Sequence, residues 1–100
     1  NELCLAAVEQ NSYALQFVKH QNNKICLTAV KQNGLALKYC LVQNNELCLA
    51  AVKQNGLALQ LVKHQIEEIC LEAIKQDSRA LRFVDKKFVD VYTYHKLLYS

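Results

Sequence analysis

The sequence repeats with a period of 22 residues, and this period limits the possible folds more than any other feature. One position of the period holds cysteine four times, with no insertion between the copies: Cys4, Cys26, Cys48 and Cys70. Leucine or isoleucine precedes each of these cysteines, and leucine follows it. The period predicts four tandem repeats, at 1–22, 23–44, 45–66 and 67–88, and a tail at 89–100 that leaves the pattern.

The first half of each repeat predicts a buried helix, and residues 46–53 are the clearest example. Leucine and alanine dominate this half, and both are strong helix formers. A helix that is apolar nearly all round is a buried one. Asn44 offers an N-cap oxygen to the first backbone N–H groups. Glu46 and Lys53 carry charges that suit the two ends of the helix dipole.

A tight turn should follow this helix, because Gln-Asn or Gln-Asp and then glycine or serine recur in every repeat. These turns are at 10–12, 32–34, 54–56 and 76–78. We expect Gly34 and Gly56 to close the first helix in the left-handed conformation. We expect Ser12 and Ser78 to act as N-caps of the next element.

The second half of each repeat predicts a short amphipathic helix of about two turns, as at 57–63. A 3₁₀ segment is one alternative. A β-containing solenoid is another, because leucine-rich repeats have a similar period, although alanine at fixed positions disfavours strand. Helices of about eight residues are unstable alone, so the repeats must stack. The expected fold class is all-α, an α-solenoid of four 22-residue helix-turn-helix repeats with a C-terminal capping helix.

The tail favours two different structures. Apolar residues continue at helical spacing from Leu81 to Leu98, and no glycine or proline interrupts the chain after Ser78. These features predict one long capping helix that begins near Ser78. The β-branched and aromatic run at 89–94 favours strand instead.

Composition and motifs exclude several classes of function. Of the 100 residues, 52% are hydrophobic, which is typical of a globular core. The net charge is +3 and the pI about 8.6, below the value of about 9 that alone suggests a nucleic-acid-binding domain. No apolar run approaches the ~18 residues of a membrane span, so we expect no membrane partner. No G-x-S-x-G, H-E-x-x-H or glycine-rich phosphate loop occurs, so we expect no enzyme, cofactor, metal or small-molecule substrate.

The cysteines and histidines are expected to be structural. Aligned cysteines should lie one helix spacing apart, ~8–10 Å, whereas a disulfide needs Cα atoms within ~7 Å. Cys40 takes a position that valine fills in the other repeats, so we expect it in the core. His20 and His64 should lie ~20 Å apart, too far to share a metal ion. Five reduced thiols imply an intracellular, reducing compartment.

Two polar columns are candidate partner-binding surfaces. The first contains Lys31, Lys53 and Lys75, and the second contains Lys38 and Arg82. Some helical solenoids read RNA with such side chains, one base per repeat, so RNA or DNA binding is the alternative function. No aromatic residue alternates with the lysines to stack bases, so the main hypothesis is a non-enzymatic scaffold for protein–protein interaction or structural assembly. Tyr92 and Tyr94 of the tail complete the candidate set.

The run Leu-Cys-Leu-Ala-Ala-Val-Lys-Gln-Asn-Gly-Leu-Ala-Leu at 47–59 is similar to a family of short tandem helical repeats of uncharacterised function. Variants of the run recur at 3–15, 25–37 and 69–81. Such repeats are associated with giant, mimivirus-like viruses and with some protists and bacteria. The resemblance implies a helical array without catalytic residues, and a viral source would imply a role in the virion or the host cytoplasm.

The first repeat begins at Asn1 inside the pattern, so we expect a fragment or component of a larger protein or assembly. Its uncapped N-terminal face should expose apolar surface and contact a protein partner, a second copy or further repeats. The repeats also differ at a few positions, namely Glu9, Thr28, Cys40, Val42, Glu72 and the tail. A specific site is expected at these differences.

Overall fold

The structure is a computed structural model that describes residues 2–88. The regular secondary structure of these residues is entirely helical. Four α-helices alternate with 3₁₀ helices. The α-helices are α1 (Glu2–Gln10), α2 (Asn23–Gln32), α3 (Asn45–Gln54) and α4 (Glu67–Gln76). The 3₁₀ helices are η1 (Ser12–Phe17), η2 (Gly34–Tyr39), η3 (Gly56–Leu61), η4 (Ser78–Phe83) and the short η5 (Lys86–Phe88).

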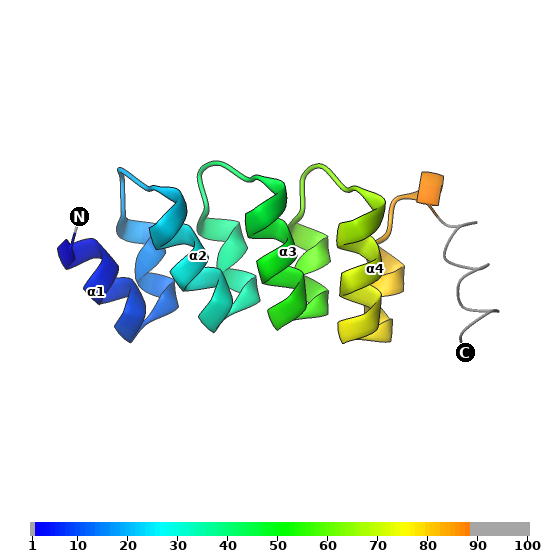
Figure 1. The fold of residues 1–100 in the computed structure, drawn as a ribbon, viewed down its shortest axis with the longest axis horizontal. Coiled ribbons are helices and arrows are strands. Elements are labelled where there is room, and N and C mark those ends of the chain that lie inside the picture. Colours follow the sequence, from blue (N-terminus) through cyan, green and yellow to red (C-terminus); the bar gives the residue numbers. More distant parts are fainter. Residues whose placement is uncertain (1, 89–100) are drawn as a thin grey trace.

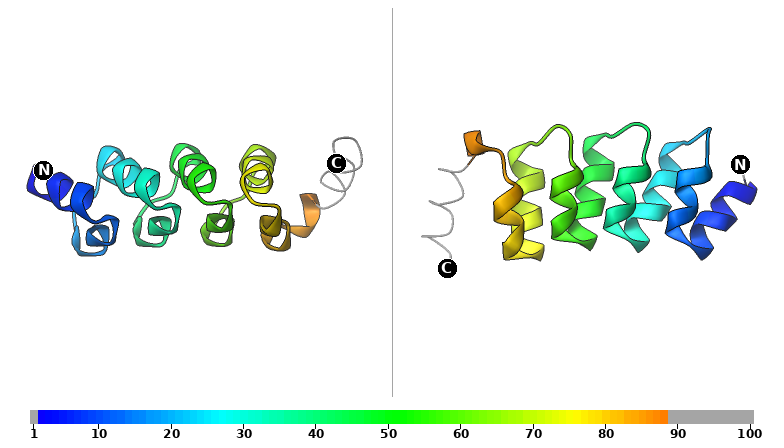
Figure 2. Two further views of the ribbon diagram at one scale, coloured as in Figure 1. Left: turned by 90° about the horizontal axis from the view of Figure 1, so that it is seen from below. Right: turned by 180° about the vertical axis from the view of Figure 1, so that it is seen from behind.

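Each α-helix and the 3₁₀ helix that follows it form one unit, and the four units stack side by side (Figure 1). The α-helices make one layer and the 3₁₀ helices make the other, as the left view of Figure 2 shows. Each α-helix packs against the next α-helix and against the 3₁₀ helix of the unit before it. The expected all-α repeat fold is confirmed.

The second half of each repeat is a 3₁₀ helix, which corrects our expectation of a two-turn α-helix. A 3₁₀ helix has three residues per turn, so every third residue lies on one face. In the third unit Gly56, Leu59 and Val62 are all buried, whereas Gln60 and Lys63 are exposed. Gly56 and the branched side chains of Leu59 and Val62 therefore face the core together.

One asparagine or aspartate per repeat ends the α-helix and begins the 3₁₀ helix. In the second repeat, the backbone N–H of Asn33 donates to Ala29 O at 2.9 Å. Its side-chain Oδ1 accepts from Leu35 N at 3.0 Å, and its own carbonyl accepts from Ala36 N at 2.9 Å. Asn11, Asn55 and Asp77 cap in the same way. The expected N-cap role of Ser12 and Ser78 is therefore wrong, since both are first residues of 3₁₀ helices.

The turn glycines serve close packing and do not supply a left-handed conformation. No glycine has a positive φ among the described residues, so that expectation is wrong. A Cβ on Gly34 would collide with the carbonyl oxygen of Ala51 in α3, and a Cβ on Gly56 would collide with that of Ala73 in α4. Ser12 takes this position in the first unit, where α1 is inclined relative to the other three α-helices (Figure 1).

The fourth unit ends as the others do. Its 3₁₀ helix stops at Phe83, and Val84 is extended with φ −74° and ψ 135°. A single helix that runs on from Ser78 is therefore wrong, because the residue after the 3₁₀ helix is extended in this unit as in the first three. The expected cap at 89–100, with Tyr92 and Tyr94, lies outside the described residues.

The core consists of columns of equivalent residues, and the first unit shows what the stacking buries. Ile25, Leu47 and Ile69 share one position of the period and are only 1%, 2% and 0% exposed. Leu3 occupies the same position in α1 and is 82% exposed. The preceding unit therefore covers this position in repeats two to four, whereas α1 exposes it.

Candidate functional site

One buried or half-buried glutamine per repeat fastens each unit to the next. Gln21 donates through Nε2 to Tyr39 O at 2.9 Å and accepts at Oε1 from Leu41 N at 2.9 Å. Gln43 bonds in the same way to Leu61 O and Lys63 N, at 2.8 and 3.0 Å. Gln65 bonds to Phe83 O and Asp85 N, both at 2.8 Å. We call these three residues the glutamine clamps.

The aligned cysteines complete the clamps. The Sγ atoms of Cys26, Cys48 and Cys70 donate to the Oε1 of Gln21, Gln43 and Gln65, at 3.3, 3.5 and 3.3 Å. Cysteine at this position is thus a hydrogen-bond donor as well as a small core residue. This double role explains why cysteine, and not alanine or valine, holds the position in the second, third and fourth repeats.

The thiols of the core are held in the protonated form. Burial raises the pKa of Cys26 and of Cys48. Burial, with a further contribution from the neighbouring Cys26 thiol, raises the pKa of Cys40 to about 12. Protonated, buried thiols are poor nucleophiles and poor metal ligands. None of the five cysteines, which all lie within residues 2–88, forms a disulfide, and these residues contain no group of three side chains placed to hold a metal ion.

Loops join each 3₁₀ helix to the next α-helix, and the clamps fix the backbone of the second and third of these loops. These loops, at 18–22, 40–44 and 62–66, lie in a row along one edge of the stack, at the top of Figure 1. Each loop presents two side chains just after its extended valine or cysteine. We call these pairs together the loop edge: Lys19 with His20, Leu41 with Val42, and Lys63 with His64.

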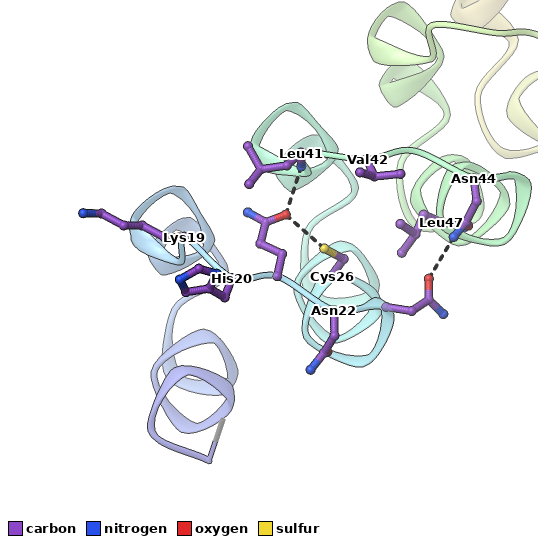
Figure 3. A pocket seen from close by; sticks show the side chains of 10 residues that line it. Lys19, His20, Asn22, Cys26, Leu41, Val42, Asn44 and Leu47 are labelled. Carbon is purple, nitrogen blue, oxygen red and sulfur yellow. Dashed lines mark hydrogen bonds between the residues drawn. The ribbon is translucent and has the colours of Figure 1, made fainter.

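The middle pair of the loop edge is apolar and lies in water. Leu41 is 64% exposed and Val42 is 74% exposed, although the equivalent pairs in the first and third loops are Lys-His. Both residues line a hollow of about 400 Å³ between the first and second loops. Figure 3 shows the residues that line this hollow, with His20 on one side and Val42 and Leu47 on the other.

The asparagine side chains of this hollow are already engaged in structure. The Oδ1 of Asn22 caps α2 by accepting from Ile25 N at 2.8 Å, and the Oδ1 of Asn44 caps α3 by accepting from Leu47 N at 2.8 Å. The Nδ2 of Asn44 donates to Asn23 Oδ1 at 2.9 Å. The arrangement therefore suits the docking of a partner better than chemistry on a substrate.

The lysines of the loop edge form no ion pair with an acidic residue among residues 2–88. Across residues 2–88 the ion pairs are Lys75–Glu72 at 3.8 Å and Arg79–Asp77 at 2.7 Å. Lys19 and Lys63 are exposed and take part in neither. Their charges are available to a bound partner.

The lysine column of the α layer lies in mixed surroundings. Lys31 and Lys53 line a second hollow, of about 520 Å³, together with Glu46 and the leucines of the outer face. Lys75 pairs with Glu72. The column thus alternates with carboxylates instead of forming a continuous basic stripe.

The second candidate column belongs to the 3₁₀ layer. Lys38 Nζ lies 5.1 Å from the ring centroid of Tyr39, and Arg82 Cζ lies 5.3 Å from that of Phe83. These contacts place each cation over an aromatic ring of its own 3₁₀ helix. The structure does not bring the two columns together, because one lies on α-helices and the other on 3₁₀ helices.

Sequence reasoning missed the glutamine clamps and Leu41. The signal for the clamps was available, because glutamine holds one position in three repeats and Lys87 replaces it in the fourth. For the loop edge, comparison of the repeats identified Val42 as a difference, but it did not identify Leu41. Only the structure shows that both side chains point into water.

The fold and the clamps define a helical tandem-repeat protein, in which each unit contacts its neighbours along the stack. The chain belongs to the family described as "Domain of unknown function (DUF4116)", whose model matches residues 1–43, 22–67 and 44–89. Each matched segment spans about two repeats, so the family unit is a pair of them. A viral, protist or bacterial source stays a prediction.

Comparison with curated proteins and with solved structures found no match. No helix within residues 2–88 has the length and apolar character needed to cross a bilayer. The function must therefore be argued from the surface of the molecule itself.

Proposed function

We propose that the chain is a non-enzymatic repeat scaffold that binds a protein partner along the loop edge. One observation carries the proposal. Leu41 and Val42 lie exposed beside a hollow, at a position where two other repeats place lysine and histidine. Apolar surface rimmed by polar residues is typical of interaction sites.

The clamps support this proposal. Gln21 holds the backbone of the second loop through Leu41 N, so the apolar pair is presented from a fixed backbone. A surface that is already ordered loses less conformational entropy when a partner binds. The same holds for the third loop, where Gln43 binds Lys63 N.

The absence of an enzymatic role is part of the proposal. Burial raises the pKa of the Cys40 thiol, which favours its protonated form, and the side-chain oxygens of Asn22 and Asn44 in the hollow cap helices. Free thiols in the core also favour a reducing compartment inside a cell. Assembly through the open face of α1 is a second expected contact, supported by the exposure of Leu3.

The repeats supply a matched variant for the test. Leu41→Lys/Val42→His gives the second loop the residues of the first and third loops, so the fold should be kept. Random peptides displayed on phage are selected on the wild-type chain, and their affinities are then measured for both proteins. We expect the selected peptides to bind the variant at least about tenfold more weakly, a loss typical of a buried apolar anchor.

The variant must show the wild-type far-UV circular dichroism spectrum and unfolding midpoint. A selection in which no peptide distinguishes the two proteins would overturn the loop edge as the binding surface. If the wild-type chain and the Leu41→Lys/Val42→His variant bound peptides equally well, the binding site would lie elsewhere on the molecule.

A further inference from the structure

The loop edge carries a pattern of charge and apolar surface that specifies the chemistry of its partner. This inference rests on the proposed function. We infer that the loop edge binds a peptide segment in the polyproline II conformation, with one apolar residue and with a carboxylate three residues before it and another three residues after it.

The charge pattern is the first argument. Three successive loops present Lys-His, Leu-Val and Lys-His, so an apolar pair lies between two basic pairs. Lys19 and Lys63 take part in neither ion pair found across residues 2–88. The residues that line the hollow include Lys19 and His20 but no carboxylate. A partner with acidic groups on both sides of an apolar side chain would complement this surface.

The acidic residues near these loops do not cancel the pattern. Glu46 accepts a hydrogen bond from Asn23 Nδ2 at 2.6 Å. Glu67 and Glu68 belong to the first turn of α4, beyond the third loop. In the fourth repeat Asp85 replaces the lysine of the pair, so the basic–apolar–basic row comprises the first three loops only.

The spacing of the units is the second argument. Packed helices lie ~8–10 Å apart, so successive loops should advance by about this distance. A polyproline II helix has three residues per turn and rises about 3.1 Å per residue, which gives about 9 Å per turn. Residues at positions one, four and seven therefore lie on one side of the peptide and follow the three loops in step. A β-strand would turn the middle residue away, because its side chains alternate.

The rigidity of the row is the third argument. Leu41 N and Lys63 N are both fixed by a glutamine from the unit before. The two loops therefore keep the spacing of the units. A polyproline II peptide is also ordered before binding, so neither side loses much conformational entropy.

The test uses the full chain and a fluorescein-labelled probe, Glu-Pro-Pro-Leu-Pro-Pro-Glu, with anisotropy read at about 50 mM salt. One control peptide carries glutamine in place of both glutamates, and another carries serine in place of leucine. We expect each control to bind about tenfold more weakly. The difference between the glutamate and glutamine peptides should shrink at about 1 M salt, where surface charges are screened.

Charge reversal of the protein gives the matched comparison. Lys19→Glu/Lys63→Glu should weaken binding of the glutamate peptide by about tenfold and leave the glutamine peptide nearly unchanged. Lys31→Glu/Lys53→Glu changes the net charge equally but lies on the α layer, so it should change binding less than about twofold. Equal losses in the two double variants would show a general charge effect and overturn the inference.

The outcomes separate this inference from the proposed function. If the glutamate and glutamine peptides bind equally and both lose affinity for Leu41→Lys/Val42→His, the acidic pattern is wrong and the scaffold function stands. If neither these probes nor any library-selected peptide depends on the apolar pair, the function itself fails at this surface. A single-stranded DNA that binds more tightly than the probe, with the same dependence on Lys19 and Lys63, would also overturn the inference, because the edge would then bind any polyanion.

Discussion

The close approach of Gly34 to the next unit allows a quantitative prediction for Gly34→Ala. The new Cβ would collide with Ala51 O, which cannot move without displacing α3. The Gly34 N–H also donates to Gln54 Oε1 at 2.6 Å, and a displaced α3 would break this bond. The substitution therefore acts on the junction between the second and third units.

The expected magnitude follows from three contributions. Overpacking of this kind destabilises by about 1–3 kcal/mol, and a lost hydrogen bond by about 1 kcal/mol. The reduced entropy of the unfolded chain offsets about 0.4–1 kcal/mol, since alanine is less flexible than glycine. The net loss should be about 1–3.5 kcal/mol, which lowers Tm by roughly 5–25 °C in a domain of this size.

Urea and thermal unfolding followed by far-UV circular dichroism measure this loss. Ser12→Ala is the matched control, because position 12 already carries a Cβ in the equivalent turn, and its stability should change by less than about 0.5 kcal/mol. A Gly34→Ala chain as stable as the wild type would refute the reasoning. Equal destabilisation by the two substitutions would show that the close approach to Ala51 does not decide the effect.

Further predictions concern the clamp, the core thiols, the open face and the lysine column. Gln43→Leu leaves a carbonyl and an N–H of the next unit unpaired, so it should destabilise by about 2–3 kcal/mol in urea unfolding and speed hydrogen exchange of the third loop. Because the pKa of Cys40 is raised to about 12, the unfolded chain releases this proton first, and stability should be complete below about pH 8.5 and fall as pH rises towards 12. Cys40→Val should flatten that pH profile, since valine holds this position in the other three repeats. Leu3→Lys should leave the free energy of unfolding within about 0.5 kcal/mol of the wild-type value and abolish any concentration-dependent association in analytical ultracentrifugation. Single-stranded RNA should bind no more tightly than about 1 µM at low salt, and tighter binding that falls steeply with salt and is lost in Lys53→Gln would instead favour the nucleic-acid hypothesis.

The period of 22 residues was sufficient to predict the stack, because equivalent apolar positions at a constant interval leave no other way to bury them. The choice between an α-helix and a 3₁₀ helix was harder. Buried residues at 56, 59 and 62 fit a three-residue period, yet the same spacing also fits two turns of an amphipathic α-helix. A segment of six residues is too short for its sequence alone to distinguish an α-helix from a 3₁₀ helix.

The turn glycines and the glutamine clamps depend on contacts between units. Gly34 looks like a helix C-cap when it is considered by itself, and only the carbonyl of Ala51 in the next unit reveals why a side chain is excluded. Gln21 reaches a backbone N–H 20 residues ahead, a contact that no local propensity encodes. The constant glutamine could have been noticed in the repeats, but its role requires the geometry of the stack.

The clamps give the array a direction of growth. Each glutamine reaches forward: its Nε2 donates to a carbonyl of the following unit, and Gln21 Nε2 also contacts Leu15 O of its own unit at 3.3 Å. A nascent chain that has completed one unit therefore carries a half-satisfied amide that favours recruitment of the next, from the N-terminus onward. Lys87 stands where the fourth glutamine would be, and its exposed ammonium can remain in water. The fourth unit thus presents no clamp amide at this position.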